Sequence, residues 1–373
     1  MRGRRLLSVF SIAAAALVNT SAFAILPSEP KEWVAPLQMF AEAQQLAAAR
    51  AAFERGEFLT VYNLIRPLAE EGNANAQVGM GRLYGVGLGI PRDDTEAMKW
   101  YRLAAEQGHP DGMNSLGYKY QYADPPVQSF EQAKYWYERA TALDYAPALN
   151  NLGLLYLDGR GVVEDRAKAV GLFERAAAGR SAPAMNNLGE IYRAGSGVPR
   201  DFAAAHKWYR SAAALGFADA MGGLGRLYEN GEGVPQDFAE AMRWYRAGIE
   251  RGSSFAATGL GGMFLEGRGV PADPKQALIL FQLGAAAELP PAFFYLGWMY
   301  ENGKGVERST SEAMRWYRLA ADRGNIGAQR TLARSSTGTK IGPKRRRGSS
   351  ARTKAESATH RCIWATSTRR ERA

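Results

Sequence analysis

The sequence predicts an all-α fold, a right-handed α/α solenoid of about seven full 36-residue helix-turn-helix repeats plus degenerate terminal units. Three observations predict it. A set of residues recurs every 36 positions, without a slip of phase, from Ala76 to Ala333. Each repeat holds two segments with apolar residues at helical spacing. A residue that commonly caps the N-terminus of a helix stands at the same place before the second segment of each repeat.

The first segment of each repeat carries a small residue, a leucine, a glycine and an aromatic residue at positions i, i+4, i+5 and i+8. In one repeat these are Ala220, Leu224, Gly225 and Tyr228. A glycine inside a helix costs about 1 kcal/mol relative to alanine. Its recurrence therefore predicts that another stretch of backbone passes close to it.

The turn that follows has Gly-x-Gly spacing in six repeats, as in Gly231 and Gly233. Glycine in the left-handed conformation ends helices, and no Gly-Lys-Ser/Thr follows to suggest a phosphate site. The second helix then begins after a predicted N-cap: Asp93, Ser129, Asp165, Asp201, Asp237, Asp273 and Ser309. Three residues later, five repeats have the Glu or Gln that predicts a capping box: Glu96, Gln132, Glu240, Gln276 and Glu312.

The second helix carries a doublet of large side chains, such as Trp244-Tyr245, and in several repeats a pair of alanines follows. Because the doublet keeps a fixed phase, we expect its rings to lie in the core between helices. The alternative is an aromatic ladder that stacks on sugars.

The combined pattern, most complete from Ala220 to Gly252, resembles the Sel1-like repeat family, a relative of tetratricopeptide repeats. The resemblance covers about 76–333. It implies an adaptor that binds other proteins in signalling, export, quality control or host interaction. A cysteine-rich branch is linked to β-lactams, but no repeat of this chain contains cysteine, so that activity is not expected here.

Four segments are predicted along the chain. Residues 1–24 resemble a signal peptide, with Arg2, Arg4 and Arg5 before a short apolar stretch and Ala22-Phe23-Ala24 at the cleavage point. Residues 25–75 are a lead-in with a degenerate N-terminal capping repeat, and 76–333 are the repeat solenoid. Residues 334–373 form a basic tail that we expect to be disordered.

The net charge of +10 comes from the ends of the chain. The tail holds 12 basic and 2 acidic residues, whereas residues 6–333 hold 32 basic and 35 acidic ones. A basic nucleic-acid face is therefore not expected on the repeats. The single cysteine lies in the tail, and the repeats contain two histidines at unrelated phases, so we expect no metal, no cofactor and no catalytic residues.

We expect protein binding on the concave surface, which the first helices line in related folds. Candidate residues outside the apolar stripe are Asn114, Tyr118, Asn150, Asn151, Asn186, Asn187, Glu190 and Arg226. An asparagine amide both donates and accepts, as the backbone of an extended peptide requires. The alternative is that the asparagines form hydrogen bonds with nearby backbone groups of the same repeat.

The sequence therefore favours an exported, non-enzymatic scaffold, periplasmic or secreted, that binds a protein or peptide, and we expect a role in regulating envelope signalling or export. After signal cleavage we expect no stable membrane span. Two alternatives stay open. One is an envelope protein that binds glycan or peptidoglycan, with or without hydrolytic activity. The other is a tail-driven binder of polyanions.

Overall fold

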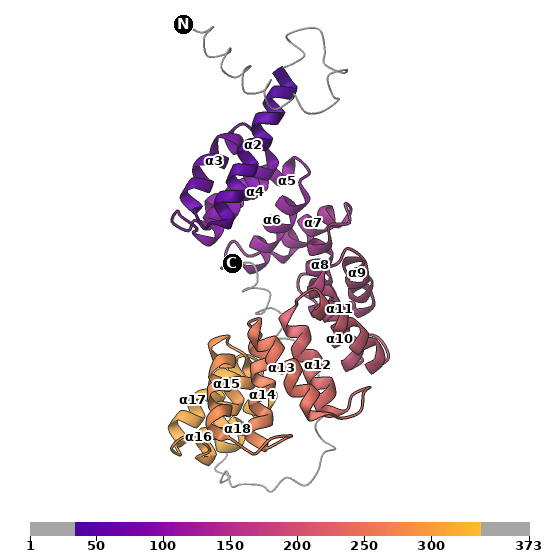
Figure 1. Cartoon of the computed structure of the whole chain (residues 1–373), viewed down its shortest axis with the longest axis vertical. Helices are drawn as coiled ribbons and strands as arrows, with labels where there is room; N and C mark the ends of the chain where they lie inside the picture. Colours follow the sequence, from indigo (N-terminus) through magenta and orange to yellow (C-terminus); the bar gives the residue numbers. More distant parts are fainter. Residues whose placement is uncertain (1–33, 337–373) are drawn as a thin grey trace, which may run out of the picture. The chain divides into compact units, whose positions relative to one another are not determined.

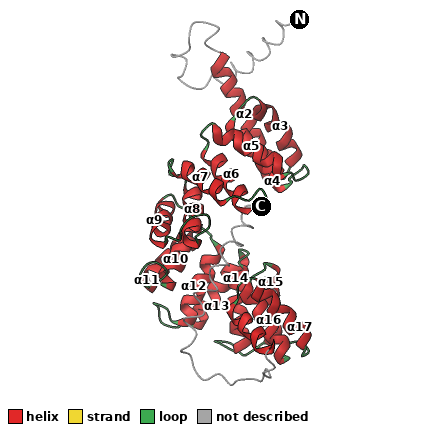
Figure 2. Cartoon of the chain, turned by 180° about the vertical axis from the view of Figure 1, so that it is seen from behind, coloured by secondary structure: helices red, strands yellow, loops and turns green. Residues whose placement is uncertain are grey.

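The computed structural model describes residues 34–336, and this part of the chain folds as helices α2 to α18 without strands. The predicted signal peptide and almost all of the predicted tail lie outside these residues. The described part divides into two compact units, 34–107 and 108–336, which are described separately. Figure 1 labels the helices along the chain, and Figure 2 shows them from behind.

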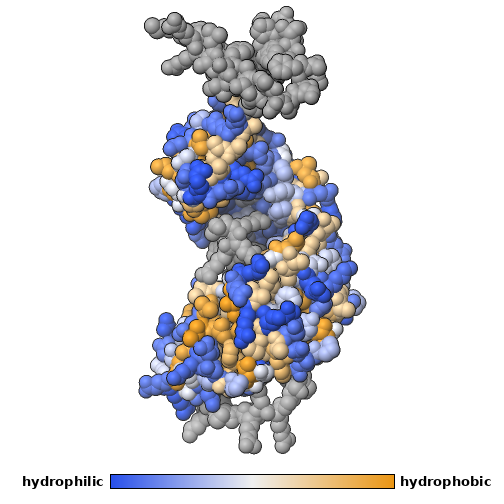
Figure 3. Space-filling view, in the orientation of Figure 1, coloured by the Kyte–Doolittle hydropathy of each residue, from blue (hydrophilic) through white to orange (hydrophobic). Residues whose placement is uncertain are grey.

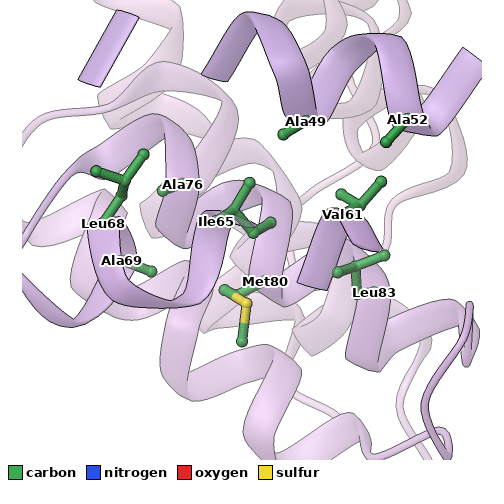
Figure 4. Close-up of a cluster of buried hydrophobic side chains, with 9 residues drawn as sticks. All are labelled: Ala49, Ala52, Val61, Ile65, Leu68, Ala69, Ala76, Met80 and Leu83. Carbon is green, nitrogen blue, oxygen red and sulfur yellow. The ribbon is translucent and has the colours of Figure 1, made fainter. Parts of the chain in front are cut away.

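Unit 1 contains two helical hairpins. Its helices are α2 (Val34–Glu54), α3 (Phe58–Glu70), α4 (Ala74–Val86) and α5 (Asp94–Glu106). The first hairpin corresponds to the predicted degenerate capping repeat, and its helices meet around Gly56. Figure 4 shows how α2, α3 and α4 share one core, formed by Ala49, Ala52, Val61, Ile65, Leu68, Ala69, Ala76, Met80 and Leu83.

Unit 2 contains six hairpins and a final single helix. The first helices of its hairpins are α6 (Pro110–Tyr122), α8 (Ala146–Asp158), α10 (Ala182–Ala194), α12 (Ala218–Asn230), α14 (Ser254–Glu266) and α16 (Pro290–Asn302). The second helices are α7 (Phe130–Thr141), α9 (Arg166–Ala178), α11 (Phe202–Ala214), α13 (Phe238–Glu250), α15 (Pro274–Ala286) and α17 (Thr310–Asp322). The closing helix is α18 (Ile326–Ser336).

The predicted helix ends are confirmed at the N-caps. In all seven repeats the Asp or Ser side chain accepts a hydrogen bond from a backbone N–H in the first turn. The first glycine of the turn ends the first helix in the left-handed conformation in six repeats, with φ between 63° and 82°. The exception is α6, which ends at Ala123 in an extended conformation.

The predicted capping box is wrong. The N–H of each N-cap residue donates to the carbonyl of the repeated aromatic residue in the last turn of the preceding helix, as Asp93 does to Tyr84 at 2.9 Å and Asp237 to Tyr228 at 3.0 Å. This N–H therefore needs no side-chain acceptor. Glu96 pairs with Lys99 on the helix surface, and Glu240 pairs in the same way with Arg243.

The helical glycine faces an aromatic ring and not a second backbone, which corrects the prediction made from its recurrence. A Cβ added at Gly225 would lie 2.7 Å from the ring of Tyr245, and Gly153 stands in the same relation to Phe173. These rings are almost fully buried. The second member of each doublet is therefore a core side chain that occupies the space above the glycine.

We expect Gly225→Ala to lower the free energy of unfolding by about 1–3 kcal/mol, since the new methyl group overlaps the Tyr245 ring. Gly171→Ala is the matched control, because a Cβ there has nothing within 4 Å. Helix propensity alone should make that control neutral or slightly stabilising. Urea unfolding of both variants checks this, and equal effects would contradict the ring-over-glycine packing.

Candidate interaction surface

The predicted site residues all lie on the first helices of unit 2, from α6 to α12, but most of them are buried. The five asparagines have exposed fractions of only 1 to 6%. Tyr118 and Arg226 are half-buried, and Tyr118 packs against the ring of Tyr122. The expectation that the asparagines lie open on the concave surface is therefore corrected.

The asparagines form a buried ladder between neighbouring repeats. The amide of Asn151 donates to Asn114 at 2.9 Å, and the amide of Asn187 donates to Asn150 at 2.9 Å. Asn150 also donates to Asn151 at 3.4 Å. Each rung joins residues 37 positions apart, one more than the repeat length. The ladder therefore links α6 to α8 and α8 to α10 by hydrogen bonds between side chains. Peptide binding by these side chains stays a prediction.

The ladder ends at α12, where the next residue in the series is Gly223. Among the described residues, the Nδ2 of Asn186 is buried without a hydrogen-bond partner. Any side chain at position 223 would meet the ring of Tyr209, because an added Cβ lies 2.7 Å from it. An asparagine cannot extend the ladder there without displacing that ring.

A charged cluster replaces the ladder beyond this point. Glu190 binds the guanidinium of Arg193 at 2.8 Å and also that of Arg226, which comes from the next repeat. The hydroxyl of Tyr209 donates to the same carboxylate at 2.7 Å. Glu190 and Arg193 are each 8% exposed at the side chain. Two of the predicted residues, Glu190 and Arg226, therefore meet in a buried ion-pair network.

The protonation of this cluster follows from its surroundings. Burial raises the pKa of Tyr209, so its phenol keeps its proton and donates to Glu190. Burial by itself would lower the pKa of Arg193, but the attraction of Glu190 outweighs it, and the pKa of Arg193 rises. Tyr209 therefore stays protonated and Arg193 stays positively charged across the neutral pH range.

A second ion-pair site follows one repeat later, and sequence reasoning missed it. The carboxylate of Glu229 accepts a hydrogen bond from Tyr245 at 2.6 Å and pairs with Arg268. Arg268 also contacts Glu266 at 3.3 Å. At the rim of the cluster, Glu232 pairs with Arg193 at 3.4 Å. Burial raises the pKa of Tyr245, so this phenol also stays a donor.

A pairing rule in the sequence could have located these sites. The last turn of the first helix faces the doublet ring of the same repeat. In three of the five repeats where that ring is tyrosine, a polar residue at this position accepts its hydroxyl: Gln121–Tyr137 at 2.8 Å, Glu229–Tyr245 at 2.6 Å and Glu301–Tyr317 at 2.6 Å. Where it is phenylalanine, the position is apolar. The two such repeats pair Leu157 with Phe173 and Leu265 with Phe281.

Two tyrosine repeats depart from this pairing: the acceptor position is Gly85 in the repeat of Tyr101 and Arg193 in the repeat of Tyr209. Arg193 occupies the acceptor position, and Tyr209 turns to Glu190, one turn earlier on the same helix. The change of partner brings a cation and an anion together on α10. Arg226 then joins them from α12 and lies over the ring of Phe255 on α14. Three first helices thus contribute to one cluster.

We name the half-buried residues of this cluster and of the second ion-pair site the charged strip, formed by Arg226, Glu232, Glu266 and Arg268. Their side chains are between 15 and 33% exposed. Exposed large apolar side chains of unit 2 lie elsewhere, on second helices and loops, such as Ile279 and Leu283 on α15. Figure 3 shows polar and apolar areas interspersed on the viewed face.

Within residues 34–336, no helix has both the length and the apolar character needed to cross a membrane. In the same part of the chain, no three His, Cys, Asp or Glu side chains are grouped so that they could hold a metal ion.

A family model described as Sel1 repeat matches seven consecutive segments: 74–109, 110–145, 146–181, 182–217, 218–253, 254–289 and 290–325. The chain is also 33% identical to a protective antigen with an SLR fold from uropathogenic Escherichia coli. That similarity covers 76% of this chain and 61% of the antigen, with a TM-score of 0.51. A Sel1 repeat protein from Oxalobacter formigenes is 30% identical over 80% of this chain and 90% of its own, with a TM-score of 0.48.

Among curated proteins, a 107-residue segment is 32% identical to the ERAD-associated E3 ubiquitin-protein ligase component HRD3A of Arabidopsis thaliana. The segment is 28% of this chain and 16% of the plant protein. The chain therefore spans about a sixth of that relative and about three fifths of the bacterial antigen.

Proposed function

Because this chain belongs to the Sel1 repeat family, whose members commonly act as protein-interaction scaffolds, we propose that it is an exported, non-enzymatic scaffold that binds a partner protein through the charged strip. The exported location, periplasmic or secreted, rests on the signal-like residues 1–24. A role in envelope signalling or export is part of the same proposal.

One observation carries the choice of surface. The residues that recur in every repeat are used in helix capping and core packing, whereas the charged strip departs from the repeat pattern and remains partly exposed. Three of its four charged side chains are held by buried partners: Arg226 by Glu190, Arg268 by Glu229 and Glu232 by Arg193. Preorganised side chains lose little conformational entropy on binding, which favours a protein partner with complementary charges.

The test is crosslinking and capture from the native cell with the full chain as bait. Glu232→Gln with Glu266→Gln removes the two rim carboxylates but leaves Glu190 and Glu229 to neutralise the arginines. The matched control, Glu240→Gln with Glu312→Gln, removes two carboxylates that pair with arginines on the outer surface of α13 and α17.

We expect a protein that the unaltered chain and the control capture equally, and that the rim variant captures several-fold less. Equal capture by the rim variant would rule out the charged strip. Capture of glycan fragments alone would favour the glycan-binding alternative. Capture that is lost only when 334–373 are deleted would favour the polyanion-binding tail.

A further inference from the structure

A surface pocket of about 490 Å³ lies between the second helices α7 and α9 in unit 2. Lys134 borders it from α7, and Arg166 and Lys168 border it from the first turn of α9. The turn between α8 and α9 completes the wall with Val162 and Val163. The pocket thus combines three cations and two carboxylates, those of Glu164 and Asp165, with an apolar side.

The three cations stand where no other repeat has a lysine or an arginine. At the position of Lys134 the other repeats carry Met98, Val170, His206, Met242, Leu278 and Met314. At the position of Arg166 they carry Asp94, Phe130, Phe202, Phe238, Pro274 and Thr310. At the position of Lys168 they carry Glu96, Gln132, Ala204, Glu240, Gln276 and Glu312.

These substitutions are not needed for the fold. The equivalent helices have the same bounds relative to the repeat and the same N-cap hydrogen bonds with apolar, neutral or acidic residues at those positions. Arg166 also donates to the hydroxyl of Ser196 at 2.7 Å, whereas Lys134 and Lys168 place two ammonium groups beside one pocket where the other repeats have no lysine or arginine.

Three carboxylates lie near these three cations, but they contact them unequally. Glu164 pairs with Arg166 at 2.6 Å, and Asp165 accepts the first-turn N–H of α9. Lys134 has only a longer contact to Glu138, at 3.7 Å. The ammonium of Lys168 donates to the neutral hydroxyl of Tyr156 at 2.8 Å and lies 4.1 Å from the centre of that ring.

The hydrogen bond to Tyr156 raises the pKa of Lys168, so this side chain keeps its positive charge throughout the neutral range. Val163 is 87% exposed, although it lies beside these cations. An incoming group could therefore gain both ionic and apolar contacts.

We propose that this pocket binds a carboxylate of the partner protein, which Lys134 and Lys168 hold, while Val162 and Val163 contact the apolar residue next to it. The proposal rests on the proposed scaffold function and names a second contact site for the same partner. A lysine pair with an apolar wall suits a carboxylate on a peptide, because charge-assisted hydrogen bonds and apolar burial then act together.

The test uses three labelled leucine-rich heptapeptides and fluorescence anisotropy with the full chain. The first has a central glutamate and blocked ends, the second a central glutamine and blocked ends, and the third a central glutamine and an unblocked C-terminal carboxylate. We expect at least one carboxylate peptide to bind about tenfold more tightly than the fully neutral one. The first and third peptides distinguish a side-chain carboxylate from a terminal one.

Lys134→Met with Lys168→Glu should abolish this discrimination, and α7 and α9 should still form, because other repeats carry these residues at the same positions. Lys207→Met with Arg210→Glu on α11 is the matched control with the same change in net charge, and it should bind normally. Equal binding of all three peptides, or discrimination retained in the pocket variant, would overturn the proposal. Displacement studies with inorganic phosphate complete the test: binding of phosphate without binding of either carboxylate peptide would also overturn it.

The two proposals can fail separately. If capture depends on the charged strip but no peptide discrimination is found, the scaffold function stands and the carboxylate pocket does not. If the chain binds a carboxylate peptide more tightly than the neutral one but captures no protein, the pocket stands and the scaffold function does not.

Discussion

Glu190→Gln should lower the free energy of unfolding by about 3–5 kcal/mol, because it leaves the guanidinium groups of Arg193 and Arg226 without the carboxylate that they share. Glutamine keeps the shape and one acceptor for Tyr209, so the loss reports the missing charge and not a cavity. The measurement is the shift of the urea unfolding curve.

Glu240→Gln is the matched control. Its partner, Arg243, is at 2.6 Å, but both side chains are substantially exposed, and exposed ion pairs contribute about 0–1 kcal/mol. Because repeat proteins need not unfold in one step, hydrogen exchange should show where stability is lost. We expect faster exchange first in α10 and α12. A loss no larger than that of the control would show that the buried cluster contributes little to stability.

Glu229→Leu should lower the free energy of unfolding by about 2–4 kcal/mol, since the hydroxyl of Tyr245 and the guanidinium of Arg268 lose their buried acceptor. Adding Tyr245→Phe should recover about 1–3 kcal/mol of that loss, because the orphaned hydroxyl is then absent. The double variant reproduces the apolar combination of Leu157 with Phe173.

The double-mutant cycle is completed by Tyr245→Phe alone, which we expect to cost about 1 kcal/mol because one hydrogen bond is lost while Glu229 keeps Arg268. Urea unfolding of the three variants gives the coupling energy. Additive effects would contradict direct coupling between the hydroxyl of Tyr245 and the carboxylate of Glu229, since only independent sites behave additively.

The sequence was sufficient to show which helices carry the predicted site residues. It did not show whether their side chains are exposed. It indicated correctly that the site residues lie on first helices at a repeat spacing, because caps and periodicity are local properties of the chain. It placed the asparagines on an open surface, however, and they are buried. Helical periodicity reveals the apolar face of one helix, but it does not reveal which polar face a neighbouring helix covers.

The glycine illustrates the same limit. Its recurrence showed that something lies close to position 225, and the choice of backbone as that neighbour was wrong. The ring of Tyr245 fills the space instead. Both residues recur every 36 positions, so the spacing contains no information about whether they touch.

The sequence by itself determined the all-α class, the 36-residue repeat, the N-caps and the family, since each depends on short-range pattern repeated many times. Only the tertiary structure decided the asparagine ladder, the partner of each doublet tyrosine, the charged cluster around Glu190 and the pocket beside Lys168. These depend on which side chains of successive repeats meet. The asparagine rungs join residues 37 positions apart in a chain whose repeat is 36, and such cross-repeat contacts cannot be read from the repeat spacing.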